Sequence, residues 1–182
     1  SCSLVGSEMC IRDSGCDSFL DETNYSDVTS EGGYYDTEAG LNAVVNACYT
    51  PLRFWAGRED AIGLSETGTD IIAAGSGCVD NNMAAYTQSL DGTNSACTFY
   101  FDRFYAAINW CNTAISHART VPNPSNDEIL ATTLNKREAE ARVLRTFYYW
   151  ILTETFGDTY YTDQPSTSIV MNPVKTSTDD IY

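Results

Sequence analysis

Residues 138–158 read EAEARVLRTFYYWILTETFGD, and this stretch decides the fold class. Apolar side chains recur in it at three- and four-residue spacing, which predicts one amphipathic helix from 126 to 156. Such a helix would be roughly 45 Å long, at 1.5 Å of rise per residue. Ser125 and Glu128 have the spacing of a capping box at its start, and Gly157 stands where a glycine cap would end it.

Two earlier segments have the same periodicity and predict helices that pack against the first. One is expected over 95–118. The other should begin after Thr37, which can cap a helix, and should kink or end near Tyr49 because Pro51 lacks a backbone N–H donor. The apolar stripe of the 95–118 helix consists of Phe101, Phe104, Tyr105, Ile108, Cys111 and Ile115.

Long helices joined by turns rich in proline and asparagine are typical of an all-α architecture of helix pairs. No segment alternates apolar and polar residues for more than a few positions, so a sheet is poorly supported. Residues 176–182, TSTDDIY, begin a further helix. We interpret this as a helical solenoid with long irregular loops, truncated at its C-terminus.

Residues 58–96 are the irregular part of the chain, with short helices expected at most near 70–74 and 82–89. A loop region of this length is uncommon in a compact domain unless it binds something, so we expect ligand contacts here. Trp55 fits a core position as well as a binding platform, whereas Trp110 and Trp150 are expected in the core or between helices. The candidate ligand-binding residues are Trp55, Arg58, Asp70, Asp80, Asn81, Asn82 and Tyr86.

The charge balance excludes several classes of function. The 182 residues include 10 Lys+Arg and 25 Asp+Glu, a formal net charge of −15, and such a surface repels nucleic acid. No stretch has the ~18 apolar residues of a membrane span. With one histidine, His117, and seven cysteines that form no CxxC pair, the sequence predicts no metal site and no cofactor. Cys48 and Cys111 are expected to be buried; Cys78 and Cys97 could pair.

The start of the chain divides into two parts. Residues 1–14, SCSLVGSEMCIRDS, have no folding pattern; 3–14 resemble a translated sequencing-adapter segment, and a native leader is the alternative. In residues 15–33, small residues before Cys16 match what remains of a bacterial lipoprotein box, whose cysteine carries a lipid thioether. We expect lipidation at Cys16, a polar tether as far as residue 33, and the helical domain over 34–182.

Three segments together resemble the SusD/RagB-type glycan-binding lipoproteins of Bacteroidetes. They are GCDSFLDE near the start, YAAINWCNTAI at 105–115, and 138–158, which follows the family pattern Glu–Ala–x–x–Leu–Arg–Ala–x–x–Tyr–x–x–Leu–x–x–x–Phe–Gly–Asp. Thr146 replaces the usual alanine, and Thr159-Tyr160 stand where the family commonly has Val-Pro. The matching residues of the two helical segments are Asn109, Asn112, Glu140, Leu144, Arg145, Tyr149, Leu152, Phe156, Gly157 and Asp158.

The resemblance covers about 15–182 and implies the N-terminal part of a surface-exposed outer-membrane lipoprotein built from tetratricopeptide-like helix pairs. It implies an oligosaccharide ligand, a SusC-like TonB-dependent transporter as partner, and no catalysis. Glu140 and Arg145 should tie their helix to its neighbours, and Asn109 and Asn112 should bond backbone groups. Sugar contacts are expected from the candidates of 58–96, although the glycines after Thr69-Asp70 supply no aromatic platform.

Two other functions stay open at this stage. A helix-repeat scaffold would bind protein partners through a groove between its helices. An all-α glycoside hydrolase would need two carboxylates facing each other across the scissile bond. The acids available for such a pair are Asp60, Glu66, Asp70 and Asp80.

Overall fold

The computed structural model of the chain describes residues 33–75 and 81–182, and at positions 56, 60, 81 and 82 it describes the backbone alone. The predicted lipidation site Cys16, the leader and most of the tether lie outside the described residues. A short 3₁₀ helix, η1 (Tyr34–Asp36), comes first. The remaining elements are α2 (Glu38–Cys48), α3 (Thr50–Gly57), α4 (Glu59–Ser65), α5 (Asn81–Ala85), α6 (Ser95–Ala118), α7 (Glu128–Phe156), β1 (Thr159–Tyr160), β2 (Lys175–Thr176) and α8 (Thr178–Ile181).

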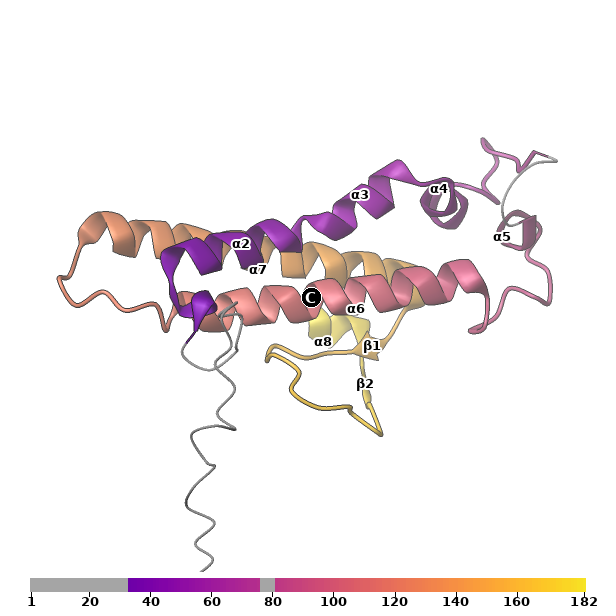
Figure 1. The fold of residues 1–182 in the computed structure, drawn as a ribbon. Helices are drawn as coiled ribbons and strands as arrows, with labels where there is room; N and C mark the ends of the chain where they lie inside the picture. The colour runs from indigo at the N-terminus through magenta and orange to yellow at the C-terminus, as the bar shows by residue number, and fades with distance from the viewer. Residues whose placement is uncertain (1–32, 76–80) are drawn as a thin grey trace, which may run out of the picture.

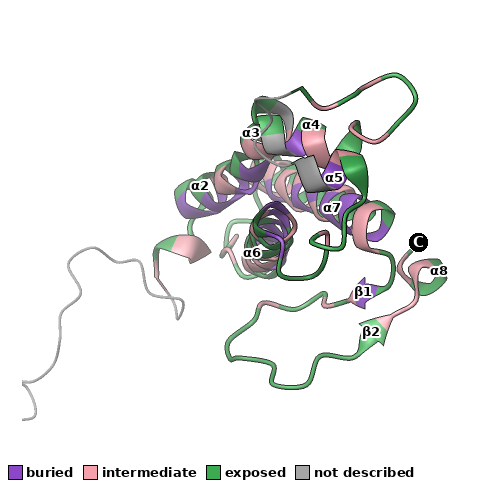
Figure 2. Cartoon of the chain, turned by 90° about the vertical axis from the view of Figure 1, so that its right-hand side faces the viewer, coloured by how far each residue is buried: buried purple, intermediate pink, exposed green. Residues whose placement is uncertain are grey.

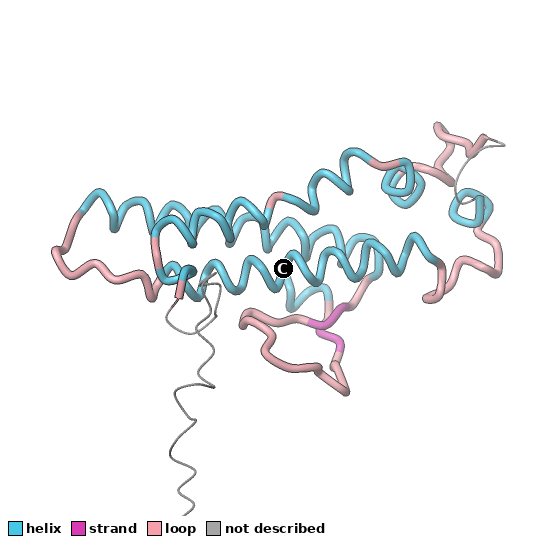
Figure 3. The backbone as a smooth tube through the Cα atoms, in the orientation of Figure 1, coloured by secondary structure: helices cyan, strands magenta, loops and turns pink. Residues whose placement is uncertain are grey.

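The all-α fold class is confirmed. The long helices α6 and α7 run antiparallel, and α2 packs against both of them (Figure 1). α4 and α5 lie at one end of this bundle, and the connection from α6 to α7 lies at the other end (Figure 3). No helix among the described residues is long and apolar enough to cross a membrane.

The break between α2 and α3 follows from Pro51, as predicted. α2 ends at Cys48, and Leu52 N–H donates to the Tyr49 carbonyl rather than continuing the α-helical pattern. The break leaves the Cys48 carbonyl without its helical donor. The phenol of Tyr148, reaching across from α7, donates a hydrogen bond to this buried carbonyl. The break in α2 is therefore closed by a side chain of another helix.

Aromatic side chains form the seam between α6, α7 and α3. The Phe104 and Tyr148 ring centroids lie 5.7 Å apart, and Trp55 packs edge-on against Tyr100 at 5.7 Å. Edge-to-face and offset pairs of this kind add to the stabilisation from buried area. The inward faces of the long helices are accordingly buried, while the segment between β1 and β2 is almost wholly exposed (Figure 2). Cys48 and Cys111 are buried in this core, as expected; Cys78 lies outside the described residues.

The ends of the helices agree with the sequence prediction at three places and differ at one. Thr37 caps α2, with its hydroxyl accepting from Gly40 N at 3.0 Å, and α6 spans the predicted residues. Gly157 ends α7 with φ at +72°. The cap of α7 is Asp127, not Ser125, because Asn126 has φ at +51° and cannot belong to a helix.

The irregular region differs from the prediction in one further respect. Residues 70–74 form no helix; the helix of this region is α4, which starts earlier at Glu59. The second short helix is present but ends at Ala85, because Tyr86 has φ at +48°. β1 and β2 form a two-residue antiparallel pair that the sequence pattern did not predict, with Thr159 opposite Thr176.

Gly40→Ala should destabilise the fold. A Cβ at Gly40 would lie 1.8 Å from the backbone carbonyl oxygen of Tyr34, so η1 would have to move away from α2. We expect a loss of about 1–3 kcal/mol of unfolding free energy, as for other overpacked sites, measured by urea denaturation. Gly57→Ala is the matched control, because a Cβ there meets nothing within 4 Å. It should be neutral or stabilise by up to about 1 kcal/mol, and equal losses in both variants would contradict the prediction.

Candidate functional site

The buried amide of Asn112 fastens the segment after β1 to α6 and α7. Its Nδ2 donates to the carbonyls of Thr162 at 3.1 Å and Gln164 at 3.0 Å. Its Oδ1 accepts a hydrogen bond from Arg145 Nη1 at 2.7 Å. Because every polar atom of this nearly inaccessible side chain is used, Asn112 joins two helices and a loop.

Three further side chains hold the same segment, again through its backbone. Tyr105 donates to the Tyr160 carbonyl at 2.7 Å, and Tyr149 donates to the Thr162 carbonyl at 2.9 Å. Asn109 Oδ1 accepts from Ser166 N at 2.7 Å. The two asparagines thus bond backbone groups of this segment.

The other residues that match the family pattern make structural contacts as well. Glu140 accepts a hydrogen bond from the Tyr49 phenol, which links α7 to the end of α2, and this bond, with burial, raises the pKa of Tyr49 to about 12. Leu144 is buried, and the Phe156 ring packs edge-on against Phe101. Asp158 accepts from Thr178 N at 2.9 Å, at the start of α8.

An aromatic pocket of about 430 Å³ lies where α3, α4 and α5 meet the end of α7. Trp55, Tyr86 and Trp150 line it, so two candidates far apart in the sequence are brought together with a third aromatic residue. Its polar side chains are the Glu154 carboxylate and the hydroxyls of Ser65, Thr67 and Thr155. We call this the aromatic pocket.

Tyr86 is held in an unusual conformation at the edge of the aromatic pocket. Its φ of +48° is uncommon for an aromatic residue, and such strain tends to gather at functional sites. The phenol ring packs against Gly68, where a Cβ would lie 2.8 Å from a ring carbon. Gly68 itself has φ at +84°. Although 70% of Tyr86 is exposed, its ring is therefore positioned by the backbone of the preceding loop.

Of the remaining candidates, the two whose side chains the structure describes, Arg58 and Asp70, do not line the aromatic pocket. Arg58 lies over the Phe99 ring, with its Cζ 4.7 Å from the centroid, and Asp70 is exposed on the loop after Gly68. Asp80 lies outside the described residues, as do the side chains of Asn81 and Asn82. The described residues contain no group of three His, Cys, Asp or Glu placed to hold a metal ion.

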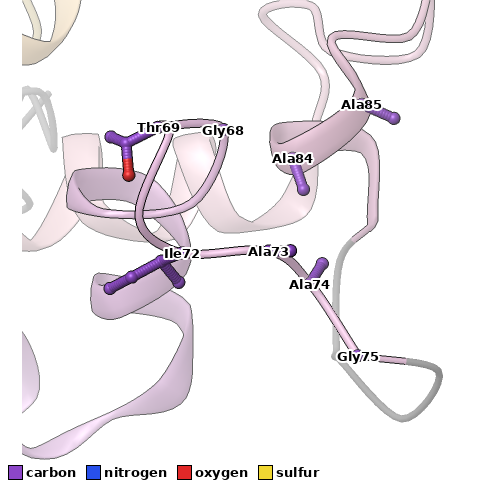
Figure 4. Close-up of a pocket in the computed structure, with 8 residues that line it drawn as sticks. All are labelled: Gly68, Thr69, Ile72, Ala73, Ala74, Gly75, Ala84 and Ala85. Carbon is purple, nitrogen blue, oxygen red and sulfur yellow. The ribbon is translucent and has the colours of Figure 1, made fainter.

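A second hollow lies between the 68–75 loop and α5, and its described lining residues offer few groups that could bind a ligand (Figure 4). Its volume is about 460 Å³, but the side chains are those of Ile72 and several alanines. Among the described lining residues, Thr69 is the one that supplies a hydroxyl. None of the described residues that line this hollow is aromatic.

Trp150 is one of the pocket residues that the sequence analysis missed, together with Glu154 and the hydroxyl side chains. It was expected in the core or between helices, yet it is 46% exposed and lines the aromatic pocket. Trp110 is likewise 38% exposed on α6. Both tryptophans lie beside the apolar stripes of their helices rather than within them. Their angular position on the helix is the signal that could have placed them at the surface.

Comparison with known proteins shows the family. Residues 18–181 match the SusD-like family described as "Starch-binding associating with outer membrane", so the chain belongs to that family. It is similar to the SusD-like protein P2 of Formosa agariphila, with 26% identity over 145 residues. That match covers 78% of this chain but 27% of the relative, so the chain spans about a quarter of the relative's length. No solved structure matches the chain significantly.

Asn112→Ala should loosen the segment after β1. The variant would remove two hydrogen bonds to loop carbonyls and one from Arg145, and we expect a loss of about 1–3 kcal/mol of unfolding free energy. Hydrogen exchange of the amides in 160–166 should increase. Asn109→Ala is the control, since it removes one exposed hydrogen bond and should cost less. If Asn112→Ala loses less unfolding free energy than Asn109→Ala, Asn112 is not the main attachment of this segment.

Proposed function

We propose that this chain contributes to binding an oligosaccharide at the cell surface and to its delivery to a TonB-dependent outer-membrane transporter. The observation that carries the proposal is the aromatic pocket, in which Trp55, Tyr86 and Trp150 surround a space of about 430 Å³. The description of the family as starch-binding and associating with the outer membrane supports it.

The chemistry of the aromatic pocket suits a neutral sugar. Pyranose rings have apolar C–H faces that pack on aromatic rings, while their hydroxyls need hydrogen-bond partners. Trp150 and Tyr86 offer exposed rings, and Glu154 offers a carboxylate that already accepts from Tyr182 Oη at 2.7 Å. The Ser65 hydroxyl donates to the Ala61 carbonyl, which leaves its oxygen free to accept from a sugar.

We propose binding without hydrolysis. Most glycoside hydrolases place two carboxyl groups on opposite sides of the scissile bond. Among the described residues that line the aromatic pocket, Glu154 is the one carboxylate. Of the acids considered for a catalytic pair, Asp70 lies outside the pocket lining, as does Glu66.

The attachment to the membrane and the partner are part of the same proposal. A thioether at Cys16 would anchor the domain through a polar tether, without a spanning helix. A bound oligosaccharide would then be held next to an outer-membrane transporter. The family's description as associating with the outer membrane supports this arrangement.

Trp150→Ala should weaken oligosaccharide binding by about tenfold, since loss of a stacked ring face removes roughly 1.4 kcal/mol. Tyr86→Ala should do the same with little change in melting temperature, because its ring is mostly exposed. Trp55→Ala should also destabilise the fold, by up to about 3–5 kcal/mol, since this ring packs on Tyr100 and Phe104. The measurement is isothermal titration of a panel of neutral plant and host oligosaccharides.

Trp110→Ala is the matched control, because it removes a tryptophan of similar exposure from a long helix outside the aromatic pocket. It should leave the affinity unchanged. A new reducing end released from any of the oligosaccharides would favour a hydrolase instead. If Trp110→Ala and Trp150→Ala weaken oligosaccharide binding equally, the aromatic pocket is not the binding site.

A further inference from the structure

Three arginines gather in a second pocket, away from the aromatic one. Arg119, Arg142 and Arg145 line a polar space of about 250 Å³ between the C-terminal half of α6, the middle of α7 and the loop at 163–165. Asn112 and Ser116 also line it. The whole chain has 10 Lys+Arg and a net charge of −15, so three guanidinium groups in one small space are unusual here. We call this the arginine pocket.

Two of these arginines share a single carboxylate oxygen. Arg119 Nη2 and Arg142 Nη2 lie 2.8 Å and 2.6 Å from Oε1 of Glu138. The hydrogen bond from Arg119, together with those from Arg142, lowers the pKa of Glu138, so this carboxyl stays ionised. Glu138 therefore fixes both side chains at the rim while neutralising one of the two charges.

Arg145 has no carboxylate partner among the described residues. Its Nη1 donates to Oδ1 of Asn112 at 2.7 Å and to the Asp163 carbonyl at 3.3 Å, and both acceptors are neutral. The side chain is half-buried, where an unneutralised charge is costly. The Asp163 carboxylate also lines the pocket, and its Oδ1 accepts from Gln164 Nε2. Three guanidinium groups thus face two carboxylates, and the pocket keeps a net positive charge.

We propose that the arginine pocket binds an oxyanion, a carboxylate or a sulfate group. The planar guanidinium fork matches the geometry of such groups and can hold them with two parallel hydrogen bonds. The space suits one charged group, and none of its described lining residues has an aromatic ring on which a neutral sugar would stack. The group could come from an acidic sugar unit or from a free inorganic anion. The site does not depend on sugar binding in the aromatic pocket.

The test is a titration of the 182-residue chain with trigalacturonate, with sodium sulfate and with neutral maltotriose at low salt. We expect saturable binding of at least one of the two anions, abolished at about 1 M NaCl by screening. Binding of trigalacturonate alone would identify an acidic sugar as the source, and binding of sulfate would identify the oxyanion itself. If neither anion binds at low salt, the proposal is wrong. Maltotriose reports on the aromatic pocket separately.

The variants locate the binding. Arg142→Gln should lower the anion affinity at least about tenfold, and Arg142→Lys, which keeps the charge without the fork, should lower it less. If circular dichroism shows that Arg142→Gln folds poorly, Arg119→Gln serves as the second variant, because the Arg119 side chain is more exposed. Arg137→Gln is the control, because it removes the same charge from α7 at a residue paired with Glu140 outside the pocket. Equal weakening by Arg137→Gln would mean diffuse attraction and would overturn the site.

Discussion

The hydrogen bond from the Tyr148 phenol to the Cys48 carbonyl joins α7 to the end of α2, and the packing of the helices depends on this connection. Pro51 cannot donate, so the helix that begins at Glu38 breaks, and the break would leave a buried carbonyl without a partner. Burial raises the pKa of the Tyr148 phenol, so it stays protonated and keeps donating. After the break, α3 runs on towards α4 (Figure 1). Trp55, which lies on α3, lines the aromatic pocket.

The antiparallel pair of α6 and α7 contributes to two pockets of different chemical character at different positions along its length. The aromatic pocket lies at the end where α6 begins and α7 ends, and its rings come from two helices, α3 and α7, and from the loop after α5. The arginine pocket lies towards the opposite end, where the charge of Arg145 meets two neutral oxygens. Several residues of the family pattern attach neighbouring segments, but Phe156 also lines the aromatic pocket, and Asn112 and Arg145 line the arginine pocket. A sequence motif that identifies a family can therefore hold the fold together and also contribute side chains to the pockets.

The sequence predicted what depends on local periodicity and missed what depends on tertiary placement. The bounds of α6 could be read from its apolar spacing, and in the structure Asn94 caps its start. The start of α7 could not, because Ser125 and Asp127 are both good caps, and the positive φ of Asn126 decides between them. Tyr86 was selected by residue type, but its fixed position against Gly68 comes from two loops that meet in space. Trp150 was missed because its exposure depends on how α7 is rotated against its neighbours.

The attachment of the segment after β1 has an evolutionary consequence. Tyr105, Asn112 and Tyr149 all bind main-chain carbonyls of residues 160–164, which every amino acid provides. Substitutions among those residues would leave the attachment intact, provided the backbone keeps its path. Divergence is thus permitted at the exposed positions of 160–164, whereas the buried Thr159 is held by its surroundings as well. The surface side chains of this segment can therefore change one at a time while the hydrogen bonds to its backbone are kept.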